Sequence, residues 1–321
     1  MLAALAGRLG AAALALLAVA TATFLLVHMA PGGPLVALGG EHAAPGQVEE
    51  LARRLGLDRP LWRVYLDWLG RLAQGDLGVS YRHQMPVAAL IAERLPATLA
   101  LVVPSILLSA AIGVALGLLA LPGPGRPRRA LAGWMAALHA LPTYLVAQLL
   151  VLALARGLDL LPVQGIADAR APAGSWPGLA LDWAHHLVLP VTALTLHHLT
   201  LVALLVRRRV ADELPRAYVR TAQAKGASPL RVLLVHALPN GLLPLVALLG
   251  VRLGSVIVGA VVVETVFAIP GLGRLLVTAA VARDHPTVIG VALVAAAAII
   301  LANLATDLLH RRTDPRFEEV G

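Results

Sequence analysis

Two pairs of adjacent histidines, His185-His186 and His197-His198, are the side chains of this sequence that could bind a metal ion. Neighbouring residues on a helix point their rings in different directions, because only positions three or four apart share a face. No carboxylate stands at ligand spacing beside His197. We therefore expect interfacial or structural histidines and no metal site, with metal binding as the alternative.

Arg252 and Glu264 are the charged side chains that could act on a solute inside a membrane. Arg252 lies in the middle of the apolar run 241–263, and Glu264 follows that run. A charge at the centre of a span is costly unless it is paired or faces water. Arg252 is expected either to face a cavity, where it could meet a substrate carboxylate, or to pair with a neighbouring helix. Glu264 could contact a substrate amine or serve in gating or packing.

Several kinds of catalytic machinery are missing from the sequence. It has no Gly-x-x-x-x-Gly-Lys-Ser/Thr loop, and Lys225 is the single lysine. It has no cysteine, which excludes disulfides and thiolate metal sites. Carboxylates are nearly absent from the span centres, so no proton relay is apparent. We expect a chain that catalyses nothing, binds no cofactor and depends on an external source of energy.

The segment Tyr218-Val-Arg-Thr-Ala-Gln-Ala-Lys-Gly226 could dock another protein. A short alanine-rich helix should end at Gly226 in the left-handed conformation. Ser228 and Pro229 then suit the N-cap and first position of a new helix. Small side chains at Ala217, Ala222 and Ala224 would permit close approach, and the arginines at 216 and 220 could meet acidic partner residues. The alternative is an ordinary basic loop.

Composition indicates a polytopic membrane protein. The 321 residues are 59% hydrophobic and only 14% charged, against about 25% charged in soluble proteins. A helix needs about 20 apolar residues to cross a bilayer. Six runs qualify, the fifth interrupted by Arg252: 9–27, 97–121, 130–155, 187–206, 241–263 and 286–306. The first could instead be a signal peptide, but its length and lack of a clean cleavage site favour an uncleaved span.

The distribution of arginine predicts the orientation. The side that holds both termini and residues 207–240 carries fourteen basic and five acidic residues, whereas the other side carries eleven and twelve. The first side should be cytoplasmic, so the segment 29–96 lies outside. The net charge of +8 then reflects topology and not nucleic-acid binding.

The outer segment 29–96 should contain short amphipathic helices. Residues 47–55 place Val48, Leu51 and Leu55 on one helical face, and apolar residues from Trp62 to Ala73 repeat at helical spacing. Aromatic side chains at 62, 65 and 68 could anchor this element at the membrane interface. We expect a lid packed on helix ends, or alternatively a contact with an external partner.

The docking segment resembles the coupling motif of ATP-binding-cassette importer permeases, written Glu-Ala-Ala, three residues, Gly, nine residues, Ile-x-Leu-Pro. Nine residues separate Gly226 from His236-Ala-Leu238-Pro239, so Gly, Leu and Pro fall at the expected spacing. Arg220-Thr221-Ala222 replaces Glu-Ala-Ala, as is typical of the dipeptide/oligopeptide/nickel branch. Further stretches resemble that branch: Gly75-Asp-Leu-Gly-Val-Ser-Tyr81, Glu93-Arg-Leu-Pro-Ala-Thr-Leu99, Val263-Glu-Thr-Val-Phe-Ala-Ile-Pro-Gly-Leu-Gly-Arg274, Arg283-Asp-His-Pro286 and Asp314-Pro-Arg316. A departure is Pro31-Gly-Gly-Pro34, where the branch often has Gly-Asp-Pro.

The resemblance implies an all-α membrane protein of six spans with the type I importer permease fold. It implies a first span (1–28), an external segment (29–96), a five-span core (97–310) with a coupling loop (207–240), and a cytoplasmic tail (311–321). The implied coupling residues are Arg216, Ala217, Tyr218, Arg220, Thr221, Ala222, Ala224, Lys225, Gly226, Leu238 and Pro239. Arg252 and Glu264 stay candidates for the pathway.

The resemblance also implies partners in a bacterial inner membrane. They are two ATPase subunits that bind ATP and magnesium, a second and usually different permease, and an external solute-binding protein. Peptides are the expected substrate, with nickel or another small solute as the alternative. A secondary transporter should show an internal repeat or intramembrane acids, and a membrane scaffold would not need the coupling spacing.

Overall fold

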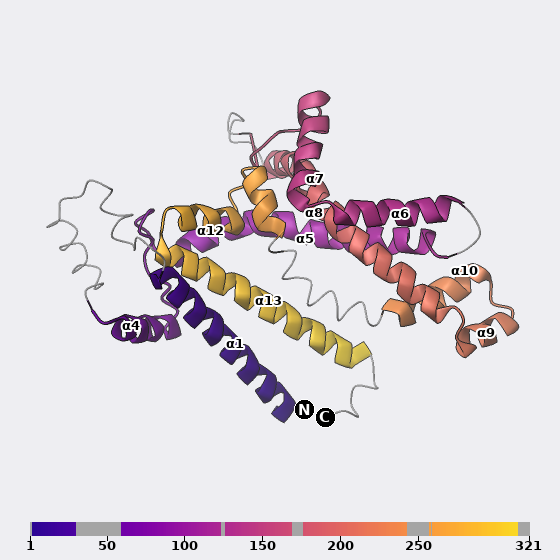
Figure 1. Cartoon of the computed structure of the whole chain (residues 1–321), viewed down its shortest axis with the longest axis horizontal. Coiled ribbons are helices and arrows are strands. Elements are labelled where there is room, and N and C mark those ends of the chain that lie inside the picture. Colours follow the sequence, from indigo (N-terminus) through magenta and orange to yellow (C-terminus); the bar gives the residue numbers. More distant parts are fainter. Residues whose placement is uncertain are drawn as a thin grey trace. The chain divides into compact units, whose positions relative to one another are not determined.

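The computed structural model describes residues 2–29, 59–122, 126–168, 176–242, 257 and 259–313, and the regular structure in these ranges is helical (Figure 1). The chain forms two compact units. One consists of Met1–Ala97 and Pro270–Ile300, and the other of Thr98–Ile269 and Leu301–Gly321. We call them the first and second unit and describe each by itself.

Four helices in the described ranges are long and apolar enough to cross a bilayer. They are α1 (Leu2–Met29), α5 (Val87–Leu119), α8 (Trp176–Glu213) and α13 (His285–Thr313). They overlap four of the predicted spans and are longer than them. The prediction counted only uncharged residues, so it began α5 ten residues late, beyond Glu93 and Arg94. These two residues form an ion pair at 3.2 Å.

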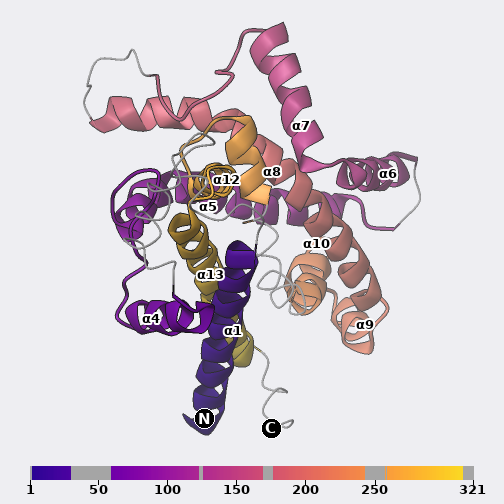
Figure 2. The same ribbon diagram turned by 60° about the vertical axis from the view of Figure 1, so that its left-hand side comes forward.

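The third predicted span is not one continuous helix. Residues 130–155 divide between α6 (Arg126–Ala140), α7 (Thr143–Leu150) and the π-helix η1 (Val151–Gly157). The chain bends by 103° between α6 and α7, a break visible in both views of the ribbon (Figures 1 and 2). Pro142 explains the bend, because proline lacks an N–H and disfavours helical geometry in the residue before it.

One further predicted proline lies within a continuous helix, and two other predicted elements lie wholly or mostly outside the described residues. Pro190 lies inside α8, which continues through it without interruption. Most of the predicted fifth span, with Arg252 and Pro244, lies outside the described residues. The predicted helix over 47–55 also lies outside them.

The helix α4 (Leu61–Ala73) packs within the first unit. Trp68 is buried against Phe24 of α1, with ring centroids 5.2 Å apart, and Tyr65 shares a 2.7 Å hydrogen bond with Thr21. Ile289 and Leu293 of α13 complete the same cluster. α4 therefore packs on α1 near its C-terminal end and on α13 near its N-terminal end. The interfacial-anchor prediction is wrong for Trp68, whereas Trp62 remains 59% exposed.

Candidate functional site

The helix α9 (Ala217–Ala224) is the core of the predicted docking segment. Arg216 is its N-cap, and Gly226 follows its end with φ +82°, in the left-handed region that favours glycine. The next helix is α10 (Pro229–Arg231), and its N-cap is Ser228. The Oγ of Ser228 accepts a hydrogen bond from the Arg231 N–H at 3.4 Å. The predicted helix end and N-cap are therefore confirmed.

Each side of α9 has a distinct role. Val219 and Ala222 are buried against Val232, with Ala227 beside them. Ala222, one of the predicted docking residues, therefore packs its side chain inside the segment. The remaining predicted residues of α9 and its ends form an exposed face, which we call the docking face: Arg216, Ala217, Tyr218, Arg220, Thr221, Ala224, Lys225 and Gly226.

The docking face is basic, and the carboxylate of Glu213 contacts two residues at its N-terminal end. Tyr218 Oη donates a 2.7 Å hydrogen bond to Glu213 at the end of α8. A guanidinium nitrogen of Arg216 lies 3.9 Å from the same carboxylate. Partial burial and the contact with Glu213 raise the pKa of Tyr218 to about 12, so the phenol remains neutral at physiological pH. Arg220 and Lys225 extend the positive charge along the exposed side.

The second half of the segment is anchored on α8. The π-helix η2 (Val232–Ala237) brings Ala237 into a buried cluster with Val206 and Val210. Leu238 packs on this cluster, while Pro239 is exposed. A Cβ added at Gly241 would lie 3.1 Å from a Val210 methyl. The Leu-Pro end of the motif thus fixes the segment to a long helix, and both ribbon views place α9 and α10 beside the end of α8 (Figures 1 and 2).

A stripe of small residues joins α8 to α5. Ser105, Ser109, Gly113 and Gly117 recur at intervals of four, so they occupy one side of α5. We call these four residues the small-residue stripe. Small residues at this spacing allow helices in membranes to approach closely. The spacing is present in the sequence, but the predicted sites did not include it.

Distances at the stripe show how close α5 and α8 are. Ser109 Oγ lies 3.3 Å from the Thr195 carbonyl oxygen of α8. A Cβ added at Gly117 would lie 2.7 Å from the Ala203 carbonyl oxygen. At the end of the pair, Arg207 Nε donates a 2.8 Å hydrogen bond to the Ala120 carbonyl. Packed and hydrogen-bonded contacts therefore run from α9 through η2 and α8 to α5.

Two sequence stretches of the first unit, 75–81 and 283–286, meet in the structure. Asp284 is buried and accepts hydrogen bonds from Ser80 Oγ, from the Tyr81 N–H at 2.9 Å and from Thr287 Oγ1 at 2.7 Å. Burial, and next the charge of Asp284, raise the pKa of Tyr81. We call these residues the Asp284 latch. It joins the turn at residues 80–81 to the start of α13. These residues lie too far apart in the sequence for a local pattern to pair them.

Glu264 is fully buried in the second unit. Its Oε1 accepts a 2.7 Å hydrogen bond from Thr98 Oγ1 of α5. The chain turns back just after it, where the Ile269 N–H donates to the Glu264 carbonyl oxygen at 2.9 Å. This placement suits the packing or gating alternative, while a role in the pathway stays a prediction. Arg252 lies outside the described residues.

Neither histidine pair converges on a common point. The ring planes of His185 and His186 are 85° apart, and those of His197 and His198 are 83° apart. His186 Nδ1 lies 3.0 Å from a carboxylate oxygen of Asp182, four residues earlier on α8, a partner that was not predicted. Within the described ranges, no three histidine or carboxylate side chains are grouped to hold a metal.

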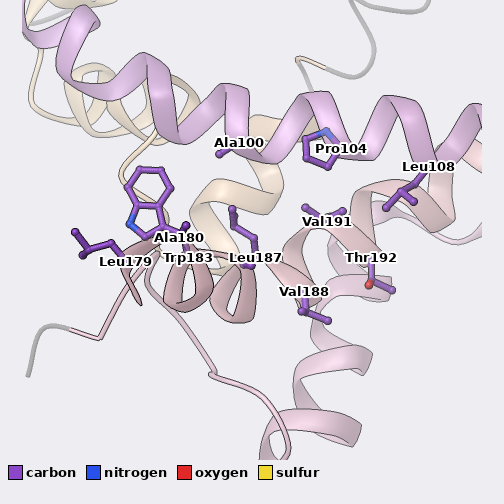
Figure 3. Close-up of a pocket in the computed structure, with 11 residues that line it drawn as sticks. Ala100, Pro104, Leu108, Leu179, Ala180, Trp183, Leu187, Val188, Val191 and Thr192 are labelled. Atoms are coloured by element: carbon purple, nitrogen blue, oxygen red, sulfur yellow. The ribbon is translucent and has the colours of Figure 1, made fainter. Parts of the chain in front are cut away.

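A groove of about 1040 Å³ lies between α5 and α8 in the second unit. Figure 3 shows Ala100, Pro104 and Leu108 on one wall and Trp183 and Leu187 on the other. The described side chains that line it include no charged group, and Thr192 supplies a hydroxyl. It suits apolar contact and offers nothing to a charged solute.

The chain matches two known families along most of its length. Residues 109–319 match the family described as binding-protein-dependent transport system inner membrane component. Residues 1–102 match the corresponding N-terminal family. The paired matches cover both residues 29–96 and residues 207–240.

Curated relatives are similar over nearly their whole length. The dipeptide transport system permease protein DppB of Escherichia coli K12 is 34% identical over 327 residues, covering 96% of each chain. The di/tripeptide permease DppB of Pseudomonas aeruginosa is 34% identical and covers 98% of each. The oligopeptide permease AppB of Bacillus subtilis is 33% identical over 310 residues, covering 94% of this chain and 95% of that protein.

A solved structure shares the fold. A chain of the inward-facing MetNI methionine ABC transporter aligns with a TM-score of 0.53 at 18% identity, covering 71% of this chain and 97% of that chain. The predicted all-α type I importer permease fold is confirmed. By fold, by family matches and by full-length similarity, the chain belongs to the binding-protein-dependent transport system inner membrane components, the multi-pass permeases of ABC importers.

Proposed function

We propose that this chain is a permease subunit of an ATP-driven importer of dipeptides or oligopeptides. The observation that carries the coupling role is the geometry of α9, whose basic docking face is exposed while its opposite side is packed onto η2. The substrate class is supported by relatives named for dipeptide, di/tripeptide and oligopeptide transport. No observation in the described part of the chain favours nickel.

The proposed partners are two ATPase subunits, a second permease and an external solute-binding protein. ATP and magnesium are bound by the ATPase subunits. Both termini and α9 lie in the cytoplasm, as the excess of arginine on that side supports. Segment 29–96 and α12 (Leu272–Val281) then lie on the outer side.

ATP-driven closure of the ATPase subunits is proposed to move α9. Val219 and Val232 pass this movement to η2, and Ala237 passes it to Val206 and Val210 of α8. The small-residue stripe makes α5 move with α8, because close-packed helices shift as bodies and deform little. This path needs no titratable group.

Mild-detergent purification of the tagged chain, followed by mass spectrometry, tests the assembly. We expect the two ATPases, a second permease and a solute-binding protein to be recovered. Uptake of radiolabelled dialanine and of nickel should then be compared in proteoliposomes. ATP-dependent dialanine uptake supports the proposal. Recovery of the chain alone under several detergents, or nickel uptake without peptide uptake, would contradict it.

A further inference from the structure

A pocket of about 250 Å³ in the first unit gathers cationic side chains. Arg82 and His83 come from the outer turn, Arg94 from α5 and Arg274 from α12. The remaining lining residues are Pro270, Gly271, Leu275 and Thr278. Three guanidinium groups around so small a cavity repel one another, so the pocket favours an anion.

The start of α12 adds to this positive field. Gly271 is its N-cap, with no side-chain cap and no acidic residue in the first turn. Arg274 occupies that first turn, although a helix N-terminus carries partial positive charge and favours an anion. A cation in this turn adds to the positive potential at the start of the helix.

Arg94 has an unsatisfied hydrogen-bond donor at this pocket. One terminal nitrogen contacts Glu93 at 3.2 Å. Its Nε is buried and has no hydrogen-bond partner among the described residues. A buried donor without a partner is costly. Glu93, the neighbouring acid, is 57% exposed at its side chain, so water screens its attraction for Arg94 and leaves much of the charge uncompensated.

We propose that this pocket binds a carboxylate presented by an acidic side chain of the external solute-binding protein. The inference rests on the proposed function and names one contact of that partner. Arginine recognises carboxylates through paired hydrogen bonds. Whole small-molecule ligands usually occupy about 300–1,000 Å³, so a pocket of 250 Å³ suits a side chain better than a free peptide.

ATPase stimulation by the co-purified solute-binding protein, titrated on the complete complex in nanodiscs, tests this contact. Arg82→Gln and Arg94→Gln should each raise its half-saturating concentration about tenfold, the loss expected for one charge-assisted contact. Both variants should also flatten the dependence of half-saturation on salt. Arg82 is exposed, so its variant should fold even where Arg94→Gln does not.

Arg59→Gln is the matched control. It removes one charge from the same unit, but Arg59 is 60% exposed, pairs with Asp67 at 3.2 Å and lies outside the pocket. Its half-saturating concentration and salt dependence should equal those of the wild type.

The carboxylate could instead come from the peptide itself. Trialanine and its C-terminal amide separate the two sources. If the pocket holds the peptide's carboxylate, the pocket variants should slow transport of trialanine but not of the amide, and half-saturation by the binding protein should not change. That result overturns the proposal. The proposal is also overturned if the pocket variants leave the half-saturating concentration of the solute-binding protein unchanged with both peptides. A wild-type complex that the binding protein fails to stimulate contradicts the proposed function, and the inference falls with it.

Discussion

Gly117→Ala should separate α5 from α8, and the structure gives the size of the effect. The new Cβ would lie 2.7 Å from the Ala203 carbonyl oxygen and 2.8 Å from Val206 Cβ. Neither atom can rotate away, since one belongs to the backbone and the other is fixed to it. Forcing an extra carbon into such packing costs about 1–3 kcal/mol.

Gly133→Ala is the matched control for this change. Gly133 lies within α6, and a Cβ added there meets nothing within 4 Å. Both substitutions gain about 1 kcal/mol of helix propensity, so the difference between them isolates the clash. Gly117→Ala should therefore be less stable than Gly133→Ala by about 1–3 kcal/mol.

Thermal and denaturant unfolding of the detergent-solubilised chain, followed by tryptophan fluorescence, measures this difference. Peptide transport per ATP hydrolysed should fall for Gly117→Ala and stay constant for Gly133→Ala. Equal stability of the two variants would refute the close contact between α5 and α8. Lower stability with unchanged transport would refute the role of that contact in coupling.

Three further predictions concern other parts of the chain. The Gly226→Asp variant should insert into the membrane but lose peptide-stimulated ATPase activity, whereas Gly226→Asn should keep more of this activity. Both side chains tolerate φ near +82°, and only Asp adds negative charge. Equal ATPase activities of the two variants would contradict the electrostatic reasoning. Asp284→Ala should destabilise the chain by about 1–3 kcal/mol because it leaves buried donors unpaired, and Asp284→Asn should destabilise it by less. Thermal unfolding measures both changes, and equal losses of stability in the two variants would contradict the Asp284 latch. Trp68→Ala should lower stability by about 3–5 kcal/mol through lost packing of α4 and should speed limited proteolysis of that helix. Trp62 is exposed, so Trp62→Ala should change stability by less than about 0.5 kcal/mol. Similar cleavage of both variants would contradict the packing of α4.

Local signals in the sequence predicted the helix boundaries around Gly226 and Ser228 correctly. The helix end at Gly226 and the N-cap at Ser228 depend on nearby backbone geometry, so residue type predicted them. Hydropathy likewise located four of the spans. It misplaced the start of α5 because it counted only uncharged residues, whereas the helix begins at Val87 and includes Glu93 and Arg94.

Contacts distant in sequence could not be predicted in this way. Ser80 and Asp284 are 204 residues apart, and no local pattern pairs them. Ala222 is buried because it packs against Val232, which belongs to the π-helix η2. The small-residue stripe was readable from its spacing, but only the structure shows that its partner is α8.

Site-directed crosslinking from α9 tests the central claim most directly. The chain has no cysteine, so each single-cysteine variant carries one thiol for a maleimide–benzophenone probe. Ala224 is exposed on the docking face, whereas Ala222, two residues away, is buried. In the assembled complex, Ala224→Cys should crosslink to an ATPase subunit, and Ala222→Cys should give little or no adduct. Crosslinks from Ala222→Cys as strong as those from Ala224→Cys, or none to an ATPase subunit from either position, would contradict the assignment of α9 as the coupling helix.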